Sequence, residues 1–312
     1  MNKNKEINIA IIGAGKLGTT IAHAIASKNK KNIKIISISS PTQKDLNRAK
    51  TILGELSKNI QFTKSNKKAV AKTNCIFICT PDDSIKKVCR ELFSKKDLTE
   101  IKQKKENIFV IHFSGSKHLK NLESAKTAGA GTLSIHPLKS IASIPGAIKT
   151  LKNTEYGITY TTQEEEKIAK TIVKALGGNT ITVEDAKKPL YHAAACIASN
   201  YIVALIDYAV YINEKNGIKP KDSIKGLLSL AEGTIKNIRE SGTKKALTGP
   251  IARGDTKTIK AHMKNFKKHL SCKDAEIYKL MGKKTAGIAK QNKWIENKTY
   301  DELTDILNKQ TK

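Results

Sequence analysis

The residues best suited to chemistry lie along one side of a predicted helix in the middle of the chain. Residues 184–203 read EDAKKPLYHAAACIASNYIV, and a helical period of about 100° per residue gathers five polar or reactive side chains within roughly a third of the circumference: Lys188, His192, Cys196, Ser199 and Asn200. A helix that only packs into a core would carry apolar residues there. Lysine, histidine and asparagine can instead protonate or hydrogen-bond an oxygen on which negative charge develops, as in hydride delivery to a carbonyl group.

We therefore predict Lys188, His192 and Asn200 as catalytic residues and Ser199 as a substrate ligand. The competing structural explanation is that His192 and Asn200 only satisfy backbone groups between packed helices. Which explanation holds depends on which part of the protein this helix face lies against.

A glycine-rich loop near the N-terminus predicts a dinucleotide site. The loop follows the apolar run INIAII and fits GxGxxG, in which the first glycine permits a tight turn, the second lets the backbone approach a pyrophosphate and the third allows helix–strand packing. The helix that follows offers free N–H groups to the phosphates. We expect cofactor contacts from the whole loop: Gly13, Ala14, Gly15, Lys16, Leu17 and Gly18.

The second strand favours NADP over NAD. An NAD site usually has an acidic residue about 20 residues after the glycine loop, but this region reads SISSPTQK and has no acid before Asp45. Hydroxyl groups and a lysine could accommodate a 2′-phosphate, so we predict that Ser39, Ser40 and Lys44 contact the cofactor. No arginine stands at the strand end itself.

Three further strand ends carry polar residues, and the carboxyl ends of parallel strands line the ligand crevice. CTPDDS predicts cofactor contacts from Thr80 and Pro81, with Asp82 either a ligand or a helix cap. HFSGS and IHPLK place histidines at two more strand ends. We predict that these segments bind substrate through His112, Ser114, Gly115 and His136.

A loop between two predicted helices of the C-terminal region reads ALTGPIARGD. Arg253 is one of only four arginines in the chain, and its planar guanidinium could bind a substrate carboxylate in a bidentate manner. Asp255 is expected to start the next helix.

The elements that must position these residues indicate an α/β protein of two domains. Apolar strands at about 7–13, 33–39, 60–63, 75–80, 108–113, 132–136, 156–160 and 179–183 alternate with helical patterns, which favours an N-terminal, doubly wound Rossmann-type parallel sheet over residues 1–184. Strand signals then stop. Helical patterns at roughly 185–215, 220–241, 255–270, 273–291 and 299–309 predict an all-α C-terminal domain over residues 185–312 for substrate binding and dimerisation.

Composition narrows the class of function. The net charge of +29 comes almost wholly from lysines spread along the chain without interleaved aromatic residues, so a primary role in nucleic-acid binding is disfavoured. Five scattered cysteines without a CxxC pair favour buried, reduced thiols in a cytoplasmic protein and argue against zinc: Cys75, Cys79, Cys89, Cys196 and Cys272. The apolar runs are interrupted too early for a membrane span, and the N-terminus reads as mature protein rather than as a signal peptide.

Taken together, the segments IIGAGKLG, CTPDDSI, HFSGS, SIHPLKS, YHAAACIASNY and LTGPIARGD resemble a group of two-domain Rossmann-like proteins with a helical second domain. This group belongs to the wider superfamily of β-hydroxyacid dehydrogenases, pyrroline-5-carboxylate reductases and ketopantoate reductases. The resemblance covers roughly residues 5 to 265, is specific in YHAAACIASNY and LTGPIARGD, and is generic in the glycine loop. The last 45 or so residues fall outside it.

Some members of this group look like alternative ketopantoate reductases of pantothenate biosynthesis. The resemblance implies an NADPH-dependent oxidoreductase that reduces a small 2-oxo acid, best 2-dehydropantoate, with a lysine as the acid; Lys188 is the candidate. It also implies a homodimer. Two alternatives stay open: reduction of another small substrate such as the imino acid pyrroline-5-carboxylate, and a non-catalytic NADP-binding regulator.

Overall fold

The computed structural model describes residues 6–28, 30, 32–94 and 108–309. The chain divides into two compact units, Met1–Ser199 and Asn200–Lys312. The expected domain border near residue 184 lies just before helix α9 (Lys188–Lys215), and the division between the two compact units falls inside that helix. The two units are described separately.

The first unit is built on one sheet. Within the described residues it has eight strands in the order β3-β2-β1-β4-β5-β6-β7-β8: β1 (Ile7–Ile12), β2 (Ile33–Ser39), β3 (Gln61–Thr63), β4 (Cys75–Ile78), β5 (Phe109–His112), β6 (Gly131–Pro137), β7 (Glu155–Thr159) and β8 (Asn179–Thr182). Strands β1 to β6 run parallel, and the order reverses direction on either side of β1 and β4, as in a doubly wound Rossmann-type sheet. The predicted α/β fold class is confirmed.

The predicted sheet was all parallel, and this is wrong at one edge. Strand β7 pairs antiparallel with β6, so that Pro137 lies opposite Tyr156, and β8 follows β7 in parallel. The physical reason is that the segment between β6 and β7 stays at the carboxyl edge of β6, where helix α7 (Ile144–Thr150) packs beside α1 (Lys16–Ala26), instead of crossing the sheet.

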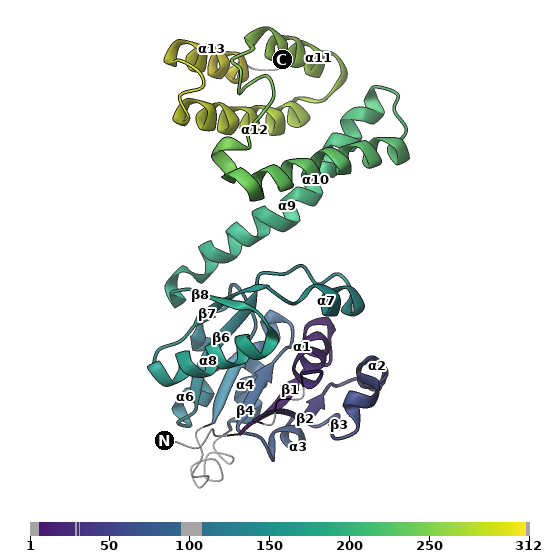
Figure 1. Ribbon diagram of the computed structural model, residues 1–312, viewed down its shortest axis with the longest axis vertical. Coiled ribbons are helices and arrows are strands. Elements are labelled where there is room, and N and C mark those ends of the chain that lie inside the picture. Colours follow the sequence, from purple (N-terminus) through teal and green to yellow (C-terminus); the bar gives the residue numbers. More distant parts are fainter. Residues whose placement is uncertain (1–5, 29, 31, 95–107, 310–312) are drawn as a thin grey trace. The chain divides into compact units, whose positions relative to one another are not determined.

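Helices cover both faces of the sheet (Figure 1). One face packs against α1, α2 (Gln43–Leu53) and α8 (Gln163–Leu176), and the other against α3 (Asn66–Val70), α4 (Ile85–Leu92) and α6 (Glu123–Thr127). Short 3₁₀ turns complete the unit: η1 (Gly54–Ser57), η2 (Asp82–Ser84), η3 (Leu119–Leu122) and η4 (Asp185–Lys187).

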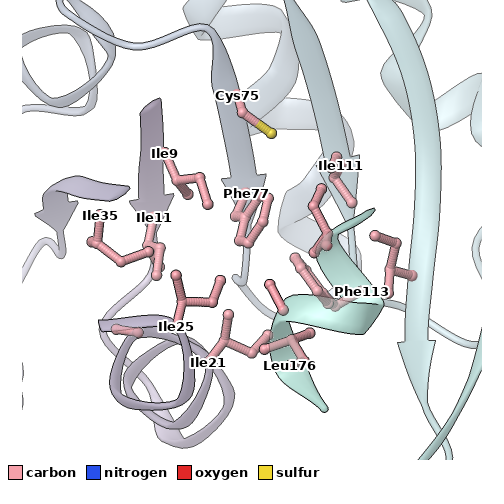
Figure 2. Packing of buried hydrophobic residues seen from close by; sticks show 14 of the residues in the cluster. Ile9, Ile11, Ile21, Ile25, Ile35, Cys75, Phe77, Ile111, Phe113 and Leu176 are labelled. Carbon is pink, nitrogen blue, oxygen red and sulfur yellow. The ribbon is translucent and has the colours of Figure 1, made fainter. Parts of the chain in front are cut away.

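The alternation of a strand explains why both faces are apolar. In β1, Ile9 and Ile11 point into the first core and Ala10 and Ile12 into the second. Figure 2 shows Ile9 and Ile11 near Phe77 of β4, with Ile21 and Ile25 of α1 packed beneath them. Burying each such isoleucine stabilises the fold by about 1.5–3 kcal/mol. These contacts therefore stabilise the sheet whose carboxyl edge carries the predicted site.

The second unit is all helical, as predicted. It comprises the C-terminal part of α9 together with α10 (Pro220–Lys245), α11 (Thr256–His269), α12 (Cys272–Gln291) and α13 (Asn297–Asn308). Helix α10 bends at Gly242, whose φ of 76° is non-helical, close to where the sequence pattern placed its end. Helices α11 to α13 share a small apolar core that includes Ile259, Leu303 and Leu307.

One observation differs from the expectation that no segment is apolar enough to cross a membrane. Residues 185–215 form a helix that is long and apolar enough to cross a membrane by length and composition only, and an 18-residue window within it has a mean hydropathy of 1.6. The apolar runs are interrupted by single polar residues such as Asn200, but one amide does not lower the average of a long window. The first turn of this helix is anchored in the Rossmann-type unit through Lys188.

All five cysteines lie in the described residues, and no disulfide bond joins any two of them. Cys75 and Cys89 are buried as expected, but Cys272 is exposed because it begins α12 at the surface.

Candidate functional site

The glycine loop has the shape that a dinucleotide requires. Gly13 has a φ of +112°, and a Cβ there would lie 2.7 Å from the carbonyl oxygen of Cys79. A Cβ on Gly18 would overlap the carbonyl oxygen of Gly13, so helix α1 and the loop touch backbone to backbone. At Gly15, by contrast, a Cβ would meet nothing within 4 Å. The loop is therefore closed on its inner side and open where a pyrophosphate would approach.

The start of α1 adds the electrostatic part of this site. Gly15 provides no side-chain cap, and the first turn contains no acidic residue, so the free N–H groups and the positive end of the helix dipole are uncompensated. Lys16 is exposed, whereas Ala14 is buried and Leu17 packs on the core. The loop residues thus fit the cofactor through backbone atoms, with only Lys16 offering a charged side chain.

The cofactor ligands predicted at the end of β2 differ in how exposed they are. The Ser39 hydroxyl is fully buried and donates to Asn66 Oδ1 at 2.7 Å, and Ser40 is buried too, while Lys44 is exposed on α2. The Ser39 hydroxyl is therefore engaged with the start of α3. Arg48, which was not among the predicted site residues, donates from Nη2 to the Ala14 carbonyl oxygen of the glycine loop at 3.0 Å.

Lys188 is the central side chain of the second part of the site. It is only 1% exposed, and its Nζ donates to the Ser134 hydroxyl at 2.7 Å and to the Ser114 carbonyl oxygen at 3.0 Å. Both acceptors are neutral. Desolvation by burial lowers the pKa of Lys188 to about 8, with Asp185 and Asp82 acting weakly in the opposite direction. An ammonium group has three N–H donors, and the third has no partner within the described chain.

His112 lies beside this lysine at the end of β5. The backbone N–H of Ser114 donates to His112 Nδ1 at 3.2 Å, which assigns the ring proton to Nε2. Burial, together with the nearby Lys188 and His136 charges, lowers the pKa of His112 to about 3, so the ring is neutral at physiological pH. His112 thus presents an N–H donor in a fixed tautomer.

His136 and two residues of α9 form the opposite wall. The rings of His136 and His192 are 5.7 Å apart between centroids, and His136 Nδ1 lies 3.1 Å from the Tyr191 hydroxyl. Burial lowers the pKa of His136 to about 4 and raises that of Tyr191 to about 12. A Cβ on Gly115 would lie 2.6 Å from His192 Nδ1, so only glycine fits between the two histidines.

Unpaired polar atoms concentrate at this edge of the sheet. Of four buried side-chain N or O atoms that lack a hydrogen-bond partner in the described residues, three belong to predicted site residues: Thr80 Oγ1, His112 Nε2 and His192 Nδ1. The fourth, Tyr156 Oη, belongs to a core residue of β7. Buried polar groups normally have partners, so this concentration indicates a place where a ligand supplies them.

The loop after β5 is held rigidly. Asp82 Oδ2 accepts from the Ser114 hydroxyl at 2.6 Å and from the Ser116 hydroxyl at 3.2 Å. Asp185 Oδ1 accepts from the Leu119 N–H at 2.8 Å, so Asp185 ties the loop to the start of α9. These contacts fix the Ser114 carbonyl oxygen that holds Lys188.

Not every predicted residue joins this cluster. Pro81 is exposed at the start of η2. Ser199 and Asn200 are exposed on α9, about 16 Å or more further along the helix from Lys188 at 1.5 Å per residue. Cys196 lies nearer, with its Sγ 3.7 Å from His192 Nε2. Arg253 is exposed in the helical unit, before α11, which Asp255 caps as expected.

Three residues of this cluster were missed by the sequence analysis or left open in it. Ser134 lies inside a strand that reads as purely structural, and Tyr191 is an aromatic residue in an apolar helix. Asp82, which follows a strand end directly, carried a detectable signal.

Comparisons with known proteins agree with this geometry. Residues 8–110 match the family model described as NADP oxidoreductase, coenzyme F420-dependent, and residues 155–285 match a domain of unknown function (DUF2520). A comparison with curated proteins finds no match. The match over residues 8–110 thus supports an NADP-binding Rossmann-type fold of the oxidoreductase class in this part of the chain.

Several solved structures share the fold over nearly the whole chain. A Thermotoga maritima protein is 22% identical with a TM-score of 0.66, covering 92% of this chain and 100% of its own. A candidate NADP oxidoreductase from Bacteroides fragilis is 17% identical with a TM-score of 0.64 and the same coverage. A pyrroline carboxylate reductase from Plasmodium falciparum, solved with NADP bound, is 14% identical with a TM-score of 0.54, covering 97% and 98%.

Proposed function

We propose that this oxidoreductase reduces the carbonyl group of a small 2-oxo acid with NADPH, and that Lys188 is its proton donor. The observation that carries the proposal is the buried Lys188 ammonium, which is held by two neutral oxygen atoms and keeps a free N–H. A pKa of about 8 suits a general acid, because the group is protonated at neutral pH and yet gives up its proton readily.

The chemistry that the residues contribute can be written step by step. Bound NADPH supplies a hydride to the carbonyl carbon. Lys188 Nζ gives a proton to the former carbonyl oxygen, so that the product is a hydroxyl group, and the neutral amine regains a proton from solvent. The Ser134 hydroxyl and the Ser114 carbonyl oxygen hold the amine in place during this exchange.

His112 has the second role in this proposal. Its Nε2–H is a neutral donor that cannot transfer its proton at physiological pH, but it can hydrogen-bond the same substrate oxygen and stabilise the charge that develops there. His136 and His192 form the wall of the substrate pocket around Gly115. Ser199 and Asn200, about 16 Å or more along α9 from Lys188, are given no role in this pocket.

The best specific substrate is 2-dehydropantoate, which would place the protein in pantothenate biosynthesis. This choice rests on the resemblance of segments such as YHAAACIASNY to alternative ketopantoate reductases. We further propose that the protein acts as a cytoplasmic homodimer. An acid is required for a carbonyl, whereas an imine is protonated before it is reduced, so the buried lysine favours the 2-oxo acid over pyrroline-5-carboxylate.

The test is NADPH oxidation by the purified protein, followed spectrophotometrically with ketopantoate and with pyrroline-5-carboxylate in parallel, and repeated with NADH. Turnover of ketopantoate alone, with kcat/KM lowered about 10²- to 10⁴-fold in Lys188→Met, is the expected result. Turnover of pyrroline-5-carboxylate alone would show that the imino acid, and not ketopantoate, is the substrate. Nucleotide binding without turnover of either compound would contradict the proposal and favour an NADP-binding regulator.

A further inference from the structure

One carboxylate of η2 ties down the turn that follows β5. Asp82 Oδ2 accepts hydrogen bonds from the Ser114 hydroxyl at 2.6 Å and from the Ser116 hydroxyl at 3.2 Å. The Ser114 side-chain oxygen in turn accepts the backbone N–H groups of Ser116 at 3.3 Å and of Lys117 at 3.0 Å. A hydroxyl group has one donor and two acceptor sites, so the Ser114 hydroxyl is fully used within this turn.

The backbone of Ser114 holds the two residues that are proposed to act on the substrate oxygen. Its carbonyl oxygen accepts from Lys188 Nζ at 3.0 Å, and its N–H donates to His112 Nδ1 at 3.2 Å. This carbonyl belongs to the peptide group that joins Ser114 to Gly115, and glycine restrains backbone rotation less than any other residue. The direction of the carbonyl oxygen therefore depends on the hydrogen bonds of the Ser114 side chain, of which the one to Asp82 is the shortest.

The charges around Lys188 favour its ammonium form only weakly. Burial lowers the pKa of Lys188 to about 8, and the negative charges of Asp185 and Asp82 act in the opposite direction. The other titratable groups that face it are His112 and His136, whose pKa values lie at about 3 and 4, so both rings are neutral at physiological pH. The two carboxylates thus supply the negative charge near this lysine.

Of these two carboxylates, Asp82 is the one that is connected to an acceptor of the ammonium group. Asp185 lies on the turn just before α9, in the same stretch of chain as Lys188, and accepts from the Leu119 N–H. Asp82 comes from η2, which follows β4, and is joined to Lys188 through a single residue, Ser114. Geometry and charge therefore both connect Asp82 with the proposed proton donor.

We propose that Asp82 is a positioning residue of this reaction. Through the Ser114 hydroxyl it fixes the carbonyl oxygen that orients the Lys188 ammonium, and its negative charge favours the protonated form of that ammonium. The inference deepens the proposed function and rests on it. It assigns Asp82 no contact with the substrate.

Four variants separate the hydrogen-bonded link from the charge. Asp82→Asn removes the charge and keeps an oxygen atom that can accept from the Ser114 hydroxyl. Ser114→Ala keeps the charge and removes the hydroxyl that carries the link. Asp82→Ala removes both. Asp83→Asn is the matched control, because this neighbouring carboxylate is 94% exposed and pairs with Lys117 instead.

The charge is tested without any substrate, by NMR titration of the full-length protein with isotope-labelled lysine side chains. The Lys188 signal is identified by its absence from the spectrum of Lys188→Met. Its titration midpoint should move down by about 0.3–0.5 pH unit in Asp82→Asn and Asp82→Ala, a small shift because Asp82 is exposed and its charge is screened. In Ser114→Ala and Asp83→Asn the midpoint should stay within about 0.1 pH unit of the wild type.

The link is tested by turnover and by structure. At pH 7, kcat/KM for ketopantoate should fall about tenfold in Asp82→Ala and in Ser114→Ala, as expected for one charge-assisted hydrogen bond, and less than about threefold in Asp82→Asn. The double variant D82A/S114A should lose no more than Ser114→Ala alone, because both changes break the same link. A crystal structure of Asp82→Ala, which needs no substrate, should show the Ser114 carbonyl oxygen turned away from Lys188 Nζ.

Three results would overturn the inference. Equal Lys188 midpoints in the wild type and in Asp82→Asn would show that the charge does not reach the ammonium. Additive losses in the double variant would show that Asp82 acts by a route other than Ser114. A carbonyl oxygen that stays on Lys188 Nζ in the Asp82→Ala crystal would show that Asp82 does not position it. The titration and the crystal structure need no turnover, so this inference and the proposed function fail separately.

Discussion

The glycine loop and the Lys188 cluster form two parts of one sheet edge, but they are built in different ways. The loop acts through backbone: a turn at Gly13, a close contact at Gly18 and an open side at Gly15. The cluster acts through side chains that come from β5, β6 and α9, which are distant in sequence. The loop is open to solvent, whereas Lys188 and His112 are buried.

This difference separates binding from chemistry. Backbone N–H groups at a helix start recognise phosphates whatever reaction follows. A buried lysine with a lowered pKa costs stability, and perturbed groups of this kind concentrate at reactive sites. Substitutions in the cluster should therefore change turnover, and substitutions in the loop should change cofactor affinity.

Lys188→Met is expected to produce the largest difference between the effect on turnover and the effect on cofactor affinity. Methionine keeps most of the volume of the side chain and removes the proton donor, so kcat/KM for ketopantoate should fall about 10²- to 10⁴-fold. NADPH affinity, measured by fluorescence titration, should stay within about twofold. A loss of NADPH binding in a folded Lys188→Met protein would break the distinction between the two regions.

Two glycines of the loop provide the next comparison. Gly15→Ala places a methyl group in open space, so the protein should fold normally while the pyrophosphate is obstructed and NADPH affinity drops about tenfold or more. Gly18→Ala places the methyl group on the Gly13 carbonyl oxygen and should lower the thermal midpoint by several degrees. The measurements are thermal melts and NADPH titrations of both variants. Equal midpoints for the two variants would contradict the backbone account of the loop.

A smaller effect is expected at His112. In His112→Gln the side-chain amide can still donate near the Nε2 position, whereas in His112→Asn it can replace only the Nδ1 contact with the Ser114 N–H. Kinetics at neutral pH should show a loss of about fivefold to tenfold for the asparagine variant, the worth of one hydrogen bond, and a smaller loss for glutamine. The reverse order would mean that the Nε2–H does not face the substrate.

The sequence predicted the parts that local rules determine. The glycine spacing and the apolar alternation of β1 were sufficient for the cofactor loop, because sterics permit few residues there. The antiparallel strand β7 was not predictable, since an apolar strand carries no mark of its direction. The burial of Lys188 against Ser134 could not be predicted from the sequence either, because it depends on how α9 packs against β6. Arg48 was missed because its contact with Ala14 spans 34 residues.

The pH dependence of kcat/KM for NADPH-dependent ketopantoate reduction tests the central claim most directly. Burial holds the pKa of Lys188 near 8, so the protonated acid is present below this pH and is lost as the pH rises through it. The account predicts a rate that is level from about pH 6 to 7.5 and then falls about tenfold per pH unit above pH 8, because His112 and His136 remain neutral throughout. In any active Lys188→Arg protein the fall should disappear, since arginine keeps its proton. A wild-type rate that stays level to pH 10 would contradict the role of Lys188 as the proton donor.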